Sequence, residues 1–228
     1  MLALSELARR SRQAVGPGPA RKRCLEVVEA FVRASGEAQD GFSDEGIGFR
    51  TAMEGELELH DHPLRRCFRH VGAGIARAWG REAPWPAAPW LWLEADGLGF
   101  AEGLLRTRRS LRHPSISPAQ VWSDHGLGRA LWFHGGGSPS VARLIEAVAS
   151  TRRPAIWAGL GLASTFTGGG PSGRLESVGG EAFGAGARFG EALRASLDGG
   201  APPFAQGFHA PLAAALGDDG VQRGGQSP

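Results

Sequence analysis

Hydrophobic residues recur at helical spacing along most of the chain, and prolines, glycines and hydroxyl residues mark where each helical pattern begins and ends. In residues 22–35, for example, Leu25, Val28 and Val32 share one face, and Gly36 ends the pattern. These signals predict eight to nine helices, at about residues 22–35, 43–59, 63–79, 89–109, 118–134, 139–150, 154–167, 181–197 and 204–216.

No segment of the sequence has the pattern of a β-strand. Alternating runs of β-branched residues are absent, and valine and isoleucine are scarce. We therefore expect an all-α fold, an array or bundle of about eight to nine helices in a single helical domain over residues 1–216. A helical bundle and an irregular solenoid both remain open. The polar tail, residues 217–228, is predicted to be disordered.

Six of the predicted helices contain a Gly-x-Gly pair. The pairs are Gly46/Gly48, Gly72/Gly74, Gly97/Gly99, Gly126/Gly128, Gly159/Gly161 and Gly184/Gly186. A glycine inside a helix costs roughly 0.5–1 kcal/mol relative to alanine, so six pairs require a compensating gain. The pairs recur every 25–33 residues, a spacing that suits one helix and its connector. We therefore interpret them as six Gly-x-Gly helix repeats.

Each pair also belongs to a strip of small residues spaced four apart, such as Gly48/Ala52 and Gly99/Gly103. Residues i and i+4 share one face of a helix, so each strip lets another group come unusually close. The strips favour close helix–helix packing. The alternative is that some of them line a groove for a long, thin apolar ligand.

The composition narrows the class of protein. The net charge of +2 argues against a dedicated nucleic-acid-binding protein. Cys24 and Cys67 lack a CxxC context, which favours two reduced thiols in a cytoplasmic protein. The charged start of the chain is not typical of a signal peptide, and no segment reaches the roughly 20 apolar residues of a membrane span.

Ionisable residues gather around the third and fourth glycine pairs, where an acid, a histidine and an arginine could transfer protons and bind an anion. The catalytic candidates are Asp96, Glu102, His125 and Arg129. The substrate-binding candidates are the aromatic walls Phe100, Trp132 and Trp157 and the glycines Gly97, Gly99, Gly126 and Gly128. The alternative is that these charged residues form structural ion pairs.

A basic run, Arg106, Arg108, Arg109 and Arg112, followed by His113, lies where the predicted helix 89–109 should end. Cations there are favoured by the helix dipole, which is the structural interpretation. The functional interpretation is a docking site for an acidic acyl carrier domain or its phosphate arm.

Residues 54–62 are rich in acids and histidines, but the chain lacks the paired Glu-x-x-His pattern of a di-iron bundle. His60-Asp61-His62 directly before Pro63 is more typical of a solvated turn between helices. The glycine clusters 135–137 and 168–170 lack a Gly-Lys-Ser/Thr ending and follow helices. We expect no metal and no cofactor.

Five segments of the sequence together resemble one known family. They are VGAGIARAW (71–79), ADGLGFAEGLL (95–105), DHGLGRALWFHGG (124–136), IWAGLGLASTFTGG (156–169) and FGAGARFGEALRA (183–195). Their order and spacing, from Gly72 to Ala195, resemble the domain of unknown function 1702 family. Members of that family are encoded beside enediyne polyketide synthases and in some other natural-product clusters.

The resemblance implies an accessory protein of enediyne-like polyketide biosynthesis that acts on or holds a long unsaturated polyketide intermediate. The alternative is a non-catalytic scaffold that docks a polyketide synthase or an acyl carrier domain. Membrane proteins of the same cluster are further candidate partners, and no nucleic acid is expected. The chain departs from the family at Ala101, where members usually carry histidine, and at His125, where they usually carry glutamine. If that histidine is catalytic in the family, this chain would be a divergent or inactive member.

Overall fold

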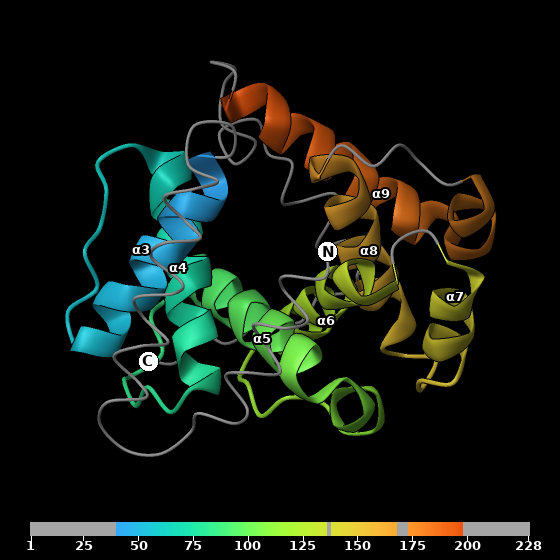
Figure 1. Cartoon of the computed structure of the whole chain (residues 1–228), viewed down its shortest axis with the longest axis horizontal. Helices are drawn as coiled ribbons and strands as arrows, with labels where there is room; N and C mark the ends of the chain where they lie inside the picture. Colours follow the sequence, from blue (N-terminus) through green and yellow to red (C-terminus); the bar gives the residue numbers. More distant parts are fainter. Residues whose placement is uncertain (1–39, 136–137, 168–172, 198–228) are drawn as a thin grey trace, which may run out of the picture. The chain divides into compact units, whose positions relative to one another are not determined.

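The computed structural model describes residues 40–135, 138–167 and 173–197, which form seven helices and no strand (Figure 1). The helices are α3 (Asp40–Glu54), α4 (Pro63–Ala78), α5 (Trp90–Arg112), α6 (Gln120–Gly135), α7 (Pro139–Glu146), α8 (Arg153–Phe166) and α9 (Gly173–Leu197). The all-α prediction is therefore confirmed for these residues. The predicted helices 22–35 and 204–216 and the tail 217–228 lie outside them.

The ends of several helices differ from the prediction. Helix α3 stops at Glu54 instead of continuing to Leu59, because Gly55 takes a left-handed conformation with φ 100°. Helix α9 starts at Gly173, earlier than the predicted residue 181. Gly180, with φ 54° and ψ −142°, breaks it, so that the predicted helix corresponds to its second part.

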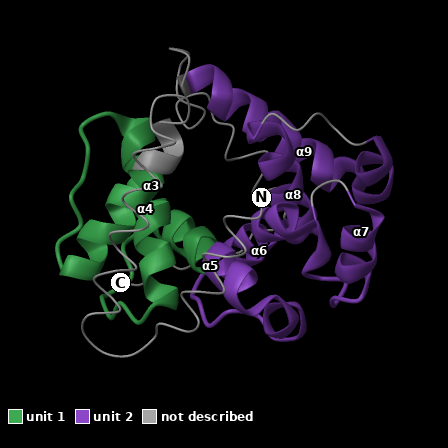
Figure 2. Cartoon of the chain, in the orientation of Figure 1, with its two compact units in different colours: residues 1–98 green, residues 99–228 purple. Residues whose placement is uncertain are grey.

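The described residues belong to two compact units, residues 1–98 and residues 99–228 (Figure 2). The boundary falls inside α5. The start of α5 therefore belongs to unit 1 with α3 and α4, and the remainder belongs to unit 2 with α6, α7, α8 and α9.

Each unit has its own apolar core. The buried core residues of unit 1 include Phe49, Ala52, Ala73 and Ala76. The core of unit 2 is built from α6, α7, α8 and α9, and its most deeply buried members include Leu131, Ile145, Ile156, Leu160 and Phe183. None of the helices in the described part of the chain combines the length and the apolar character that a membrane span requires.

The glycine pair of α4 opens both sides of this helix to neighbouring backbone. A Cβ atom at Gly72 would lie 2.0 Å from the carbonyl oxygen of Glu45 on α3. A Cβ atom at Gly74 would lie 2.0 Å from the carbonyl oxygen of Glu94 on α5. Residues two apart on a helix point about 200° apart, so the two glycines of a pair serve opposite neighbours.

The glycine pair of α8 in unit 2 likewise faces the backbones of two neighbouring helices. Cβ atoms at Gly159 and Gly161 would lie 1.8 Å from the His125 oxygen on α6 and 2.1 Å from the Phe183 oxygen on α9. In all, nine of the twelve paired glycines meet a backbone oxygen of another helix in this way. These close approaches allow weak Cα–H···O contacts and account for glycine at these positions.

Candidate functional site

The residues that the sequence singled out do not all belong to one unit. Asp96 and Gly97 are buried on α5 in unit 1. A Cβ atom at Gly97 would lie 2.0 Å from the carbonyl oxygen of Val71 on α4. All other candidates belong to unit 2, where α5 and α6 carry most of them.

In unit 2 the structure brings Phe100 and Arg129 together. The Arg129 guanidinium lies over the Phe100 ring, with its central carbon 4.7 Å from the ring centroid. The ring of Phe133 meets Phe100 edge-on, with 5.7 Å between the centroids. A buried guanidinium on an aromatic face is stabilised by the cation–π interaction. Two of the predicted site residues thus form one cluster between α5 and α6.

Glu102 makes a local contact with the connector that follows α5. Its Oε2 accepts a hydrogen bond from Ser115 Oγ at 2.6 Å. A short hydrogen bond to a charged carboxylate is among the stronger ones in proteins. Glu102 therefore fixes the connector between α5 and α6.

The side chains of His125, Trp132 and Trp157 contact other side chains of unit 2. The buried His125 ring lies against Trp122, with centroids 5.8 Å apart. Trp132 Nε1 donates a hydrogen bond to Thr167 Oγ1 at 3.0 Å. Trp157 is buried in the core of unit 2, edge-on to Phe183. Trp157 and Trp132 thus belong to or pack on the same apolar core.

Three of the four glycines predicted to line a ligand site pack against other helices of the protein. Besides Gly97, a Cβ atom at Gly99 would lie 1.8 Å from the Ser123 oxygen, and one at Gly128 would lie 2.0 Å from the Ile156 oxygen. Gly126 is buried on α6. The faces of Gly97, Gly99 and Gly128 therefore receive a helix backbone.

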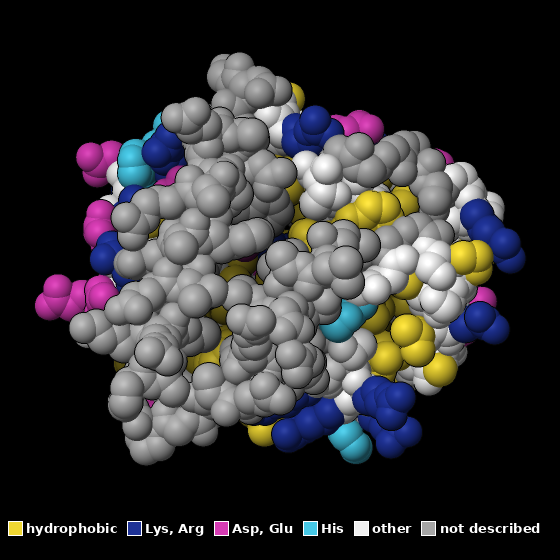
Figure 3. Space-filling model, in the orientation of Figure 1, with side chains coloured by type: hydrophobic (Ala, Val, Ile, Leu, Met, Phe, Trp, Pro, Cys, Tyr) yellow, Lys and Arg dark blue, Asp and Glu magenta, His cyan; other side chains and the backbone are white. Residues whose placement is uncertain are grey.

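The basic run is on the surface, at the end of α5. The side chains of Arg106, Arg108, Arg109 and Arg112 are all exposed. Within the described residues, none of these four guanidinium groups takes part in a hydrogen bond, ion pair or ring contact. Arg106 has φ −139° and ψ 40°, which interrupts the helix. On the face shown in Figure 3, several basic side chains, in dark blue, lie close together at the lower edge.

A comparison with known families decides the membership of the chain. The family described as "Protein of unknown function (DUF1702)" matches residues 39–192. The chain belongs to this DUF1702 family. No curated protein and no solved structure matches it. The match begins before the predicted region 72–195, and it includes α3 with the first glycine pair.

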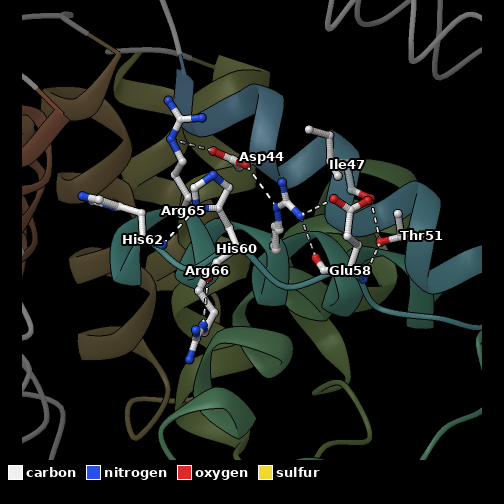
Figure 4. A network of polar contacts seen from close by, with 9 residues as sticks. Asp44, Ile47, Thr51, Glu58, His60, His62, Arg65 and Arg66 are labelled. Atoms are coloured by element: carbon white, nitrogen blue, oxygen red, sulfur yellow. Dashed lines mark hydrogen bonds and ion pairs between the residues drawn. The ribbon is translucent and has the colours of Figure 1, made fainter.

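The structure of this DUF1702 protein also contains buried ion networks that the sequence analysis did not single out. In unit 1, Asp44 Oδ1 on α3 accepts a hydrogen bond from Arg69 Nε on α4 at 3.2 Å. Arg69 Nη1 reaches Glu58 Oε1 at 3.1 Å and the Glu58 carbonyl at 2.9 Å. In Figure 4, Asp44 lies between Arg65 and Glu58, and Arg65 Nε is 3.8 Å from Asp44 Oδ2.

The connector before α4 is a turn whose polar groups bind within the protein. His60 Nδ1 accepts the backbone N–H of His62 at 2.9 Å, and Glu58 pairs with Arg69. Over the described ranges of the chain, no group of three or more His, Cys, Asp and Glu residues has the arrangement of a metal site.

Glu94 is the centre of a second network in unit 1. Its side chain is only 2% exposed. Oε2 receives Arg77 Nη2 at 2.6 Å and Arg81 Nη1 at 3.1 Å, and His70 Nδ1 lies 3.3 Å from Oε1. Burial raises the pKa of the Glu94 carboxyl, but the hydrogen bonds of His70 and Arg77 and the charges of Arg77 and Arg81 outweigh burial and lower it overall.

Arg77 extends this network to the proline-rich connector that precedes α5. Its guanidinium donates to the carbonyl oxygens of Ala83 at 2.8 Å and Pro84 at 3.0 Å. It also stacks on the Trp85 ring at 3.8 Å from the centroid. Glu94 therefore anchors the connector to α4 and α5 through Arg77.

A third network, in unit 2, joins Asp124 on α6 to Arg152. Arg152 Nε lies 3.0 Å from Oδ1 and 3.1 Å from Oδ2 of the buried carboxylate. Burial raises the pKa of Asp124, and the hydrogen bonds and charge of Arg152 offset only part of that rise. The three networks fix how neighbouring helices are aligned, which is a recognised use of buried polar groups.

Unit 2 also has a surface groove of about 510 Å³ between α7 and α9, the α7–α9 groove. It is lined by Pro139, Ala142, Arg143, Glu146, Arg174, Leu175 and Val178. Ala142 and Leu175 are buried, whereas Val178 is 47% exposed. None of the sequence-predicted site residues lines this groove.

One sequence signal could have pointed to Glu94. It stands alone as a charged residue in the apolar segment Trp90–Ala95. A carboxylate in such a segment must be buried and paired, because an unpaired buried charge is very costly. Its partners could not be named from the sequence, because the faces of α4 were not known.

Proposed function

We propose that this DUF1702 protein is an accessory protein of enediyne-type polyketide biosynthesis, and that it docks an acidic acyl carrier domain of the polyketide synthase. The biosynthetic setting is supported by the resemblance to proteins encoded beside such synthases. The docking role is supported by one observation, the four exposed arginines at the end of α5.

Those four arginines, Arg106, Arg108, Arg109 and Arg112, are here called the basic docking surface. Other arginines in the described part of the chain, such as Arg69, Arg77 and Arg152, are bound by carboxylates. Four neighbouring guanidinium groups without such partners repel one another in the free protein. A partner that brings carboxylates or a phosphate to them relieves that repulsion.

The helix dipole explains only part of this surface. Arg109 and Arg112 lie in the last turn of α5, where a cation is stabilised by the helix C-terminus. Arg106 and Arg108 lie before that turn and gain little from the dipole, because the effect falls off within one turn. Partner binding accounts for all four.

The proposal is tested by measuring the Kd of a purified, phosphopantetheinylated carrier domain from an enediyne-type polyketide synthase. Changing all four arginines of the basic docking surface to glutamine should weaken binding about 10- to 100-fold, because each lost charge pair is worth about 0.4–0.7 kcal/mol. The control is Arg188→Gln with Arg194→Gln, which removes two exposed charges elsewhere in unit 2. Equal Kd values for the wild type and the quadruple variant would exclude this docking mode.

A second candidate function is to hold the long unsaturated intermediate, and the α7–α9 groove is the observation that favours it. Its apolar lining residues include the buried Ala142 and Leu175 and the exposed Val178, and Arg143 and Arg174 supply positive charge. A conjugated polyene fatty acid such as parinaric acid is a suitable probe, because its fluorescence rises in apolar surroundings. Val178→Glu should abolish that rise, whereas Leu144→Glu, on an exposed residue outside the groove lining, should not.

The enzymatic alternative is separated from docking by co-expression with the synthase. If Asp96, Glu102, His125 or Arg129 takes part in catalysis, Glu102→Gln and Arg129→Gln should stop product conversion. If the protein docks without catalysis, those variants should retain product formation, and only the quadruple arginine variant should reduce it.

A further inference from the structure

The connector between α5 and α6 carries an isoleucine that is almost fully exposed. Ile116 is 95% exposed, whereas the next most exposed large apolar residue among the described residues, Leu59, is 49% exposed. Scattered apolar residues on a surface are ordinary, and Leu59 needs no special explanation. Ile116 differs because of where it lies, four residues after Arg112 of the basic docking surface.

The backbone on both sides of Ile116 is held in place. Ser115 Oγ donates to Glu102 Oε2 at 2.6 Å, and the backbone N–H of Ala119 donates to Ser117 Oγ at 3.1 Å. Pro114 and Pro118 restrict the backbone further, because each proline fixes its own φ and limits the preceding residue. The connector therefore presents Ile116 in a preorganised position, which lowers the entropy that a partner must remove on binding.

We infer that Ile116 is the apolar anchor of the basic docking surface, and that it enters an apolar pocket of an acidic carrier domain while the arginines pair with carboxylates around it. This inference rests on the proposed function. A buried apolar anchor surrounded by polar contacts is the usual arrangement of a protein–protein interface. Glu102 is then a positioning residue, acting through Ser115.

The chemistry of the connector favours a protein partner over a lipid surface. Binding in a membrane interface requires several apolar side chains on one face, often including tryptophan, phenylalanine or leucine. Here one isoleucine stands between two serines and two prolines. A single side chain of this size suits one pocket in a folded partner.

The experiment compares Ile116→Ser and Ile116→Leu with the wild type, using the same holo carrier domain at low and high salt. Ile116→Ser should weaken binding about tenfold at both salt concentrations, because it removes apolar burial and leaves every charge in place. Ile116→Leu should stay within about threefold of the wild type. The control Leu59→Ser, at the next most exposed large apolar residue of the described chain, should bind like the wild type.

The positioning role of Glu102 has its own readout. Glu102→Ala should weaken carrier binding, and Glu102→Gln should restore it, because the amide oxygen can still accept the Ser115 hydroxyl. A purely structural role would lower the Tm without this rescue of binding.

The outcomes separate the anchor from the docking proposal. If the arginine variant weakens binding and Ile116→Ser does not, the anchor is overturned and the docking proposal stands. If the wild type does not bind the carrier domain, the proposed function itself fails. If vesicles containing phosphatidylglycerol bind with a dependence on Ile116 while the carrier domain does not, the assignment to a protein partner is overturned.

Discussion

Arg152, the residue before α8, binds the carboxylate of Asp124 on α6 and at the same time the end of α5. Its Nη1 donates to the Leu111 carbonyl at 3.1 Å, and its Nη2 donates to the Ser110 carbonyl at 2.9 Å. One guanidinium thus joins three helical segments of unit 2. A planar group with five donors is suited to this role, and lysine could not replace it.

Asp124→Asn should destabilise unit 2 by about 3–5 kcal/mol, because it leaves the guanidinium of Arg152 largely buried without its counter-charge. Urea unfolding measures this as a lower midpoint. The double variant Asp124→Asn/Arg152→Met should recover part of the loss, since no unpaired charge then remains. Additive losses in the double variant would contradict a direct coupling between the two residues.

Gly128→Ala should lower the free energy of unfolding by about 1–3 kcal/mol, because the added methyl group would lie 2.0 Å from the Ile156 oxygen. The matched control is Gly173→Ala, where nothing lies within 4 Å of the added Cβ atom. The control should be neutral or slightly stabilising. Equal thermal stability of the two variants would contradict backbone packing at Gly128.

The contribution of Glu94 should depend on pH. Its pKa in the folded protein lies below the usual glutamate value, so the unfolded chain binds more protons at acidic pH. The stabilisation is therefore complete above the ordinary glutamate pKa and is lost as the pH falls through the lower folded value. We expect Glu94→Gln to be most destabilising near pH 7, and the gap to the wild type to shrink below about pH 4. A gap that widens on acidification would contradict the assigned sign.

Cys67 should be chemically inert in the native protein. It is a buried free thiol, and burial raises its pKa to about 12, although the charge of Arg66 lowers it slightly. In a Cys24→Ser background, Ellman's reagent should not react with the native protein and should titrate one thiol after unfolding in guanidinium chloride. A native protein that reacts stoichiometrically within minutes would show that α4 opens readily.

Local signals in the sequence predicted most of the described helices. Ser138 and Pro139 mark the start of α7, and Ser138 Oγ accepts the backbone N–H of Ser140 at 3.3 Å. Such caps act within a few residues, so they can be read without knowing the fold. The predicted helix 181–197 matches the part of α9 after the break at Gly180, whereas the part from Gly173 to Gly179 was not predicted.

The candidate site was predictable only in part. Phe100 and Arg129 were both selected because aromatic and ionisable residues are dense around the third and fourth glycine pairs, and the two side chains do meet. The partners Glu94–Arg77 and Asp124–Arg152 could not be found in this way. The two members of each pair are 17 or 28 positions apart in the sequence, so the pairing can be identified only when the packing of the surrounding helices is known.

The sequence by itself determined that helices form, and that six of them carry a glycine pair whose two members point to opposite sides. That much follows from helical geometry and from the cost of glycine inside a helix. Only the tertiary structure decided what meets those glycines. At Gly74 and Gly159 it is a backbone oxygen of another helix. A small-residue strip can pack closely against any helix, and the fold decides which helix lies beside it.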